Sequence, residues 1–213
     1  MSIIQIIALC ATGLCVAAFI FHFIRIVRLG APKDYSEKSG DVGKAVLYSN
    51  TAAMLPTQKE SAYLHLPSFT LGILLHLATF LSILVYFFSF FPFFTRWLLT
   101  DQWIHYVAAL FILTGAISGI SLFIKRLINK TLRGLSNLDD YLSNGLTTLF
   151  QVMTLFYLLL PVNSTVNTLY YIAAIILLLY MPLGKLKHVL YYFSARYHLG
   201  FFYGWRNVWP PKK

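Results

Sequence analysis

The chain has 213 residues, is 58% hydrophobic and only 11% charged, and has a mean hydropathy of +0.69. This composition excludes an ordinary soluble domain. The formal net charge of +10 would suit a nucleic-acid partner. We exclude nucleic acid because the basic residues are distributed as in the loops of a membrane protein.

Five apolar stretches are long enough to cross a bilayer as helices, which takes about 20 residues each. They cover residues 3–24, 68–90, 103–124, 143–161 and 167–190. The sequence therefore predicts an all-α fold, a single integral membrane domain over residues 1–213 with five transmembrane helices. Residues 25–64 form a long cytoplasmic loop, and residues 191–213 form an aromatic and basic cytoplasmic tail suited to the membrane interface.

The first stretch reads as a retained helix, because no basic residue precedes its apolar run as in a signal peptide. It holds the only two cysteines, Cys10 and Cys15, whose spacing puts them on different helix faces. They make a poor disulfide or metal pair, and two thiols are too few for an iron–sulfur cluster.

The basic residues alternate between loops in the way that the positive-inside rule describes. The first loop, the third loop and the tail are rich in Lys and Arg. The second loop has only Arg96 and Asp101, and the fourth has no charge. We predict an N-terminus outside, a C-terminus in the cytoplasm, and a multi-pass location in the inner membrane of a prokaryote.

Proline and glycine residues predict local features in three of the spans. Pro67 suits the first turn of the second helix, where its missing N–H is not needed. Gly115 and Gly119 form a small-xxx-small pair, which allows close helix packing in the third span. Pro182 and Gly184 predict a kink near the cytoplasmic end of the fifth span.

Two histidines stand at matching depths at the predicted cytoplasmic edge. His65 precedes the second span, and His188 lies at the end of the fifth. Neutral imidazole is a good ligand for haem iron, so we predict these two as the axial pair of a b-type haem. Nearby cations would neutralise the haem propionates, or serve only as ordinary positive-inside residues. These cations are Arg25, Arg28, Lys185 and Lys187.

His76 lies near the middle of the second span, where an ionisable residue is costly and is a functional candidate by default. Eleven residues of helix bring it within about 20° of the direction of His65, if the helix includes His65. We predict a metal-ligand role for His76. A buried hydrogen-bonding role and contact with a quinone stay open. We assign His22, His105 and His198 to the membrane interface.

The third loop places Asp139 and Asp140 beside a basic run at the membrane edge. Either acid suits the N-cap of the fourth helix. A docking surface, or a proton-handling group beside a quinone, is the functional alternative to capping and charge balance.

Three segments carry a family resemblance. They are residues 65–68 (HLPS) with Gly72 and His76, residues 136–141 (SNLDDY), and residues 184–188 (GKLKH). With the layout of spans, they resemble the gamma subunit of respiratory nitrate reductase. They are more similar to the cytochrome b subunits of complexes built around heterodisulfide-reductase-like iron–sulfur proteins. The resemblance implies haem b, a quinone such as menaquinone, and an iron–sulfur partner subunit at the cytoplasmic face.

The sequence departs from the nitrate reductase pattern at one ligand. That family has a second ligand on its last helix about five turns before the position of His188. Here this position falls near Tyr170 and Tyr171. The resemblance therefore implies one haem, while a second, bound by His76 with another ligand, stays open.

We accordingly predict a haem b-containing membrane subunit that transfers electrons between the quinone pool and a cytoplasmic iron–sulfur partner. It would be the electron-transfer subunit of an oxidoreductase complex, not a complete enzyme, because the chain has no cluster motif. One alternative is a haem-free quinone-binding membrane anchor. The other is a small transporter or assembly protein, which the near absence of acidic residues in the spans disfavours.

Overall fold

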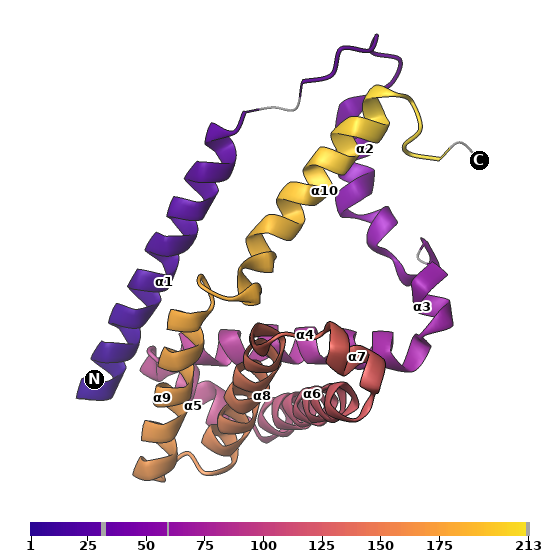
Figure 1. Ribbon diagram of the computed structural model, residues 1–213. Coiled ribbons are helices and arrows are strands. Elements are labelled where there is room, and N and C mark those ends of the chain that lie inside the picture. Colours follow the sequence, from indigo (N-terminus) through magenta and orange to yellow (C-terminus); the bar gives the residue numbers. More distant parts are fainter. Residues whose placement is uncertain (31–32, 59, 212–213) are drawn as a thin grey trace. The chain divides into compact units, whose positions relative to one another are not determined.

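The computed structural model describes residues 1–30, 33–58 and 60–211, and within them the chain is helical and contains no strand (Figure 1). The basic residues Lys59, Lys212 and Lys213 lie outside the described residues. The α-helices are α1 (Ile3–Arg28), α2 (Val42–Asn50), α3 (Glu60–Leu64), α4 (Leu66–Phe88), α5 (Pro92–Thr100), α6 (Gln102–Ile128), α7 (Lys130–Leu135), α8 (Leu138–Leu159), α9 (Ser164–Tyr180) and α10 (His188–Trp205).

Four of these helices, α1, α4, α6 and α8, are long and apolar enough to cross a membrane. The described residues contain a fifth candidate span if α9 and α10 count as one bent pair. These helices agree with the first four predicted spans and fit a multi-pass membrane protein. Pro67 lies in the first turn of α4, as predicted.

The fifth predicted span differs in extent from the structure. We expected one helix over residues 167–190 with a kink near its end, whereas α9 ends at Tyr180. A turn with Pro182 and Gly184, then a 3-10 helix over Lys185–Lys187, separates it from α10. The break lies where the kink was predicted. The first part of the tail continues as helix, because α10 extends to Trp205.

The chain divides into two compact units, which we describe separately. Unit 1 comprises Met1–Val16 and Pro67–Leu186, and unit 2 comprises Ala17–Leu66 and Lys187–Lys213. Unit 2 thus contains the whole range of the predicted loop, residues 25–64. That loop holds α2, two short 3-10 helices and α3, so it is an ordered segment.

Buried aromatic side chains form the core of unit 1. The Tyr170 side chain is fully buried, stacking on Tyr157 with 4.4 Å between ring centroids and on Phe150 with 6.0 Å. The Tyr86 hydroxyl lies 3.0 Å from the Ala8 carbonyl oxygen and donates to it, which ties α1 to α4. Burying rings of this size supplies a large part of the packing energy of the bundle.

Small residues let α4, α6 and α8 approach closely. A Cβ added at Gly119 of α6 would overlap the Thr148 hydroxyl of α8, and one added at Gly115 would overlap Ala78 of α4. The predicted packing role of this glycine pair is confirmed. Figure 1 shows α8 beside α6 and α9 in this unit.

In unit 2, α2 packs against α10. A Cβ at Gly200 would lie 2.6 Å from the Val46 Cα, so only glycine allows this approach. The Ser49 hydroxyl donates to the Arg196 carbonyl (2.7 Å), and the Arg196 Nε donates back to the Ser49 carbonyl (2.7 Å). The reciprocal bonds fix the register of the two helices.

Candidate functional site

The His76 imidazole is held by a bond to the backbone of its own helix. It lies on α4, with an exposed side chain, and its Nδ1 is 2.7 Å from the Gly72 carbonyl oxygen. A carbonyl only accepts, so Nδ1 carries a proton, and in a neutral ring the lone pair is then on Nε2. Ligating histidines commonly fix their tautomer through such a bond.

The backbone one turn before His76 leaves space beside the imidazole. A Cβ added at Gly72 would meet no heavy atom within 4 Å. Gly72 precedes His76 by four residues, so the two share one face of α4. Large apolar side chains on this helix, such as Phe80 (58% exposed) and Leu77 (47% exposed), also lie on the surface of unit 1. A flat apolar group could therefore approach the helix at Gly72.

His65 and His188 both belong to unit 2 and are exposed. His65 lies in the turn between α3 and α4, just before the first residue of α4. The helix does not include it, so the condition for a face shared with His76 is not met. His188 is the first residue of α10. Their pairing on one iron stays a prediction.

The cations proposed for haem propionates differ in their surroundings. The Lys185 Nζ is 2.7 Å from Asp140 Oδ2, so Asp140 already balances its charge. Arg25 and Arg28 lie in the last turn of α1, and the Arg25 guanidinium lies 5.8 Å from the Phe21 ring centroid. Lys187 immediately precedes α10.

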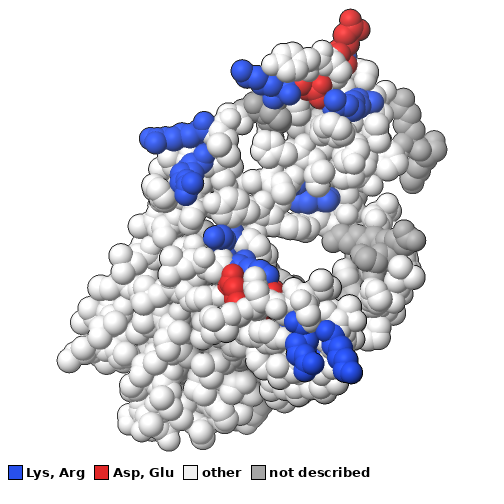
Figure 2. Space-filling model, viewed as in Figure 1, with Lys and Arg blue, Asp and Glu red and all other residues white. Residues whose placement is uncertain are grey.

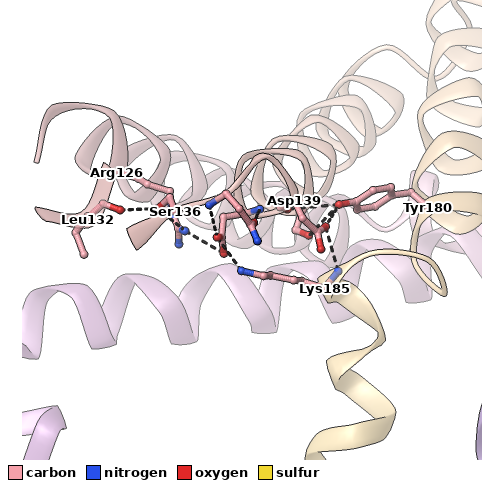
Figure 3. Close-up of polar contacts among 9 residues, drawn as sticks. Arg126, Leu132, Ser136, Asp139, Tyr180 and Lys185 are labelled. Atoms are coloured by element: carbon pink, nitrogen blue, oxygen red, sulfur yellow. Dashed lines mark hydrogen bonds and ion pairs between the residues drawn. The ribbon is translucent and has the colours of Figure 1, made fainter. Parts of the chain in front are cut away.

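Asp140 joins three segments of unit 1 at the start of α8. Besides Lys185, it pairs with Arg126 at the end of α6, with 3.1 Å between Nη1 and Oδ1 (Figure 3). Its carboxylate also accepts from the backbone N–H of Asn137, and the Asn137 side chain accepts from the backbone N–H of Asp140. The N-cap of α8 is therefore Asn137, not either aspartate as predicted, and Asp140 completes a capping box.

Asp139 holds the turn that follows α9. Its Oδ1 accepts a bond from the Tyr180 hydroxyl, a second from the backbone N–H of Lys185 (3.1 Å), and a third from the Ser143 hydroxyl (3.3 Å) (Figure 3). Gly184 lies against this group, since a Cβ there would be 2.6 Å from the Tyr180 hydroxyl oxygen. We call Asp139, Asp140, Tyr180 and Lys185 the edge cluster.

The edge cluster brings together two segments that we linked only by family resemblance. Residues 136–141 and residues 184–188 are far apart in the chain, and they meet through the bonds of Lys185 to both aspartates. Sequence reasoning missed Tyr180, Arg126 and Ser143. The only signal for Ser143 was its spacing of one helical turn from Asp139.

Charged side chains of unit 1 gather at one end of its helices. Figure 2 shows a group of Lys, Arg and Asp side chains close together, with a large uncharged surface below it in the view. The charged residues that supply this end are Lys125, Arg126, Lys130, Arg133, Asp139, Asp140 and Lys185. This distribution agrees with an edge where helices leave the membrane.

Two further groups of residues bear on metal binding, namely the two cysteines and the pair Tyr170 and Tyr171. Cys10 is exposed and Cys15 is buried, in agreement with different helix faces. Within the described ranges, no three His, Cys, Asp or Glu side chains cluster as a metal site would require. Tyr170 and Tyr171, at the position of the family's other haem ligand, are buried in the aromatic core.

Comparison with known proteins adds no further evidence. No family model, no curated protein and no solved structure matches the chain.

Proposed function

We propose that the chain is a membrane subunit that holds haem b and transfers electrons between a quinone and a cytoplasmic iron–sulfur partner. The observation that carries the proposal is His76, an imidazole on a candidate membrane span whose Nδ1 is fixed by the Gly72 carbonyl. A histidine in a membrane interior is expensive unless it has a function. The resemblance of residues 65–68, 136–141 and 184–188 to cytochrome b subunits supports the same reading.

The residues present fit a b-type haem in three respects. The bond from Nδ1 to the Gly72 carbonyl would place the lone pair of a neutral His76 ring on Nε2, and this is the form that binds haem iron. Gly72 leaves open space for a flat ring system beside that nitrogen. Large apolar side chains of the same helix, such as Leu77 and Phe80, lie on the surface of unit 1. His65 and His188 belong to unit 2 and are a separate candidate pair. When bound, haem would supply one-electron transfer between a two-electron quinone and a one-electron cluster.

The protein's own residues have separate tasks in this proposal. Gly72 orients the His76 ring and raises the basicity of Nε2 through its carbonyl. Arg25 and Arg28 belong to unit 2 and would offer positive charge to the propionates of a haem held there by His65 and His188. Lys185 is less suited to such a role because it is paired with Asp140. The apolar surface of α4 would exclude water from the iron.

We further propose that the charged end of unit 1 faces the cytoplasm of a prokaryote and that the N-terminus lies outside. The support is the excess of Lys and Arg at that end and in unit 2. An exposed cationic surface on that side would suit an acidic soluble subunit.

The test is a reduced-minus-oxidised optical spectrum of the purified chain, with haem quantified per polypeptide. We expect a b-type spectrum in the wild type and its loss or a large decrease in His76→Ala. His198→Ala, a change of an exposed histidine on α10, is the matched control and should leave the spectrum unchanged.

Separate variants His65→Ala and His188→Ala test the predicted axial pair in unit 2. If both abolish the spectrum and His76→Ala does not, the haem site is the His65–His188 pair. A folded, haem-free wild type produced with ample haem would overturn the proposal and favour the quinone-binding anchor.

A further inference from the structure

Helix α8 carries a row of polar residues along its length. The row comprises Asp139, Ser143, Thr147, Thr148, Gln151 and Thr154. The deeper members are buried, whereas the most exposed residues of the same helix are apolar, for example Leu149 and Phe156, each 42% exposed. Spacings of three and four residues put the polar groups on one face, which lies inside unit 1. We call this row the polar seam.

The seam is unusual for a membrane-spanning helix. Among the candidate spans within the described residues, α8 has a hydropathy of 1.3, whereas the others have values from 2.2 to 2.5. Polar groups in a membrane interior are costly and mark pathways for ions and protons more often than chance.

Helix packing accounts for the hydroxyls but not for every polar atom. Thr147 donates to the Ser143 carbonyl and Thr154 donates to the Phe150 carbonyl, each at 2.7 Å. Such bonds within a helix satisfy the donors, and small polar residues pack well between spans. The hydroxyl oxygens can still accept a bond.

Gln151 is the exception, because one end of its side chain is unsatisfied. The residue is fully buried, and its Nε2 donates to the Leu75 carbonyl at 2.9 Å and to the Thr79 hydroxyl at 2.7 Å. Its Oε1 is buried and has no hydrogen-bond partner within the described ranges. An unsatisfied buried acceptor costs about 1–3 kcal/mol. Native proteins commonly satisfy such a group with an internal water molecule.

The end of the seam at Asp139 is polar and lies at the charged end of unit 1. Ser143 donates to Asp139 Oδ1 (3.3 Å) and lies 3.4 Å from the Tyr180 hydroxyl oxygen. Asp139 itself belongs to the edge cluster, beside the exposed Lys185. From Asp139 to Thr154 the helix rises about 22 Å, most of the thickness of a bilayer core.

We propose that the polar seam is a water-accessible proton path from the edge cluster into the interior of unit 1. Protons enter from bulk water at the edge cluster, and water molecules between the hydroxyls and Gln151 relay them inward. Each relay step breaks one O–H bond and forms another, so no oxidant or reductant is needed. If the chain has the proposed function, on which this part of the inference rests, the protons are those that a quinone takes up when it is reduced.

Cysteine accessibility tests whether water reaches the seam. In a Cys10→Ser, Cys15→Ser background, cysteines are introduced at Gln151 and Thr147, and separately at Leu158 as the control. Leu158 lies on the same helix and is fully buried like Gln151, but it is apolar. A small charged methanethiosulfonate reagent, which reacts with thiolates in water, is added to the full chain in detergent. We expect modification at 151 and 147 at least tenfold faster than at 158.

Equal rates at positions 151, 147 and 158 would overturn the proposal. If Gln151→Cys fails to fold, Thr154→Cys replaces it, because threonine and cysteine are similar in size. A second measurement uses Gln151→Glu and follows the infrared carbonyl band of its carboxyl group on transfer to heavy water. An isotope shift complete within seconds supports proton access, and a shift that takes hours contradicts it. Neither measurement needs haem, so each can fail independently of the proposed function.

Discussion

Replacing Gly184 with alanine should weaken the edge cluster. The new methyl group would lie 2.6 Å from the Tyr180 hydroxyl oxygen and 2.7 Å from Asp139 Oδ1. Ordinary contacts between such atoms are about 3.5–4.0 Å, so the Tyr180 ring must move by about 1 Å. A displacement of that size breaks its hydrogen bond to Asp139.

Two terms set the expected magnitude. A hydrogen bond to a charged group contributes about 1.5–3 kcal/mol, and the lower end applies here because the cluster is partly exposed. Overpacking costs about 1–3 kcal/mol. The sum for Gly184→Ala is about 2.5–4.5 kcal/mol of unfolding free energy, or a decrease of about 5–18 °C in melting temperature for a chain of this length.

The assay is thermal unfolding of the detergent-solubilised protein, compared with two variants. Gly134→Ala is the control, since a Cβ there meets open space, and it should change stability by no more than about 1 kcal/mol. Tyr180→Phe removes only the hydroxyl. The double variant with Gly184→Ala should lose less than the sum of the single losses, because both changes break one bond. If Gly184→Ala melts at the same temperature as the wild type, the close contact of Gly184 with Tyr180 and Asp139 does not stabilise the protein.

Three further predictions concern other contacts. Hydrogen bonds from Ser36, and then the bond and charge of Arg206, hold the pKa of Asp34 below its ordinary value. Its stabilising effect should be complete above about pH 4 and lost as pH falls through the lowered pKa, so melting temperatures of wild type and Asp34→Asn should converge in acid. Gly200→Ala should push α2 away from α10 and increase the rate of amide hydrogen exchange in α2. An exchange rate equal to that of the wild type would contradict this prediction. Asn137→Ala should cost about 0.5–2 kcal/mol by removing the cap of α8, and a thermal melt checks this.

The sequence by itself determined the all-α fold class and the positions of four long apolar helices, whereas it did not predict the short helices α2, α3, α5 and α7. Apolar runs of about 20 residues have few alternatives to membrane helices, because every backbone N–H and C=O must be satisfied within the span. Pro182 and Gly184 similarly indicated where the last span is interrupted, since neither residue supports a continuous helix. The histidines and their spacing also came from sequence, and they led to the haem hypothesis.

Tertiary structure decided which polar residues meet. The contacts of Lys185 with Asp139 and Asp140 join segments separated by more than forty positions, which no local pattern encodes. The unsatisfied Gln151 oxygen was equally hidden, because a glutamine in an apolar run has no local signature of its partners. Periodicity reports which face of a helix is buried, but the identity of the groups across that face depends on how the helices pack.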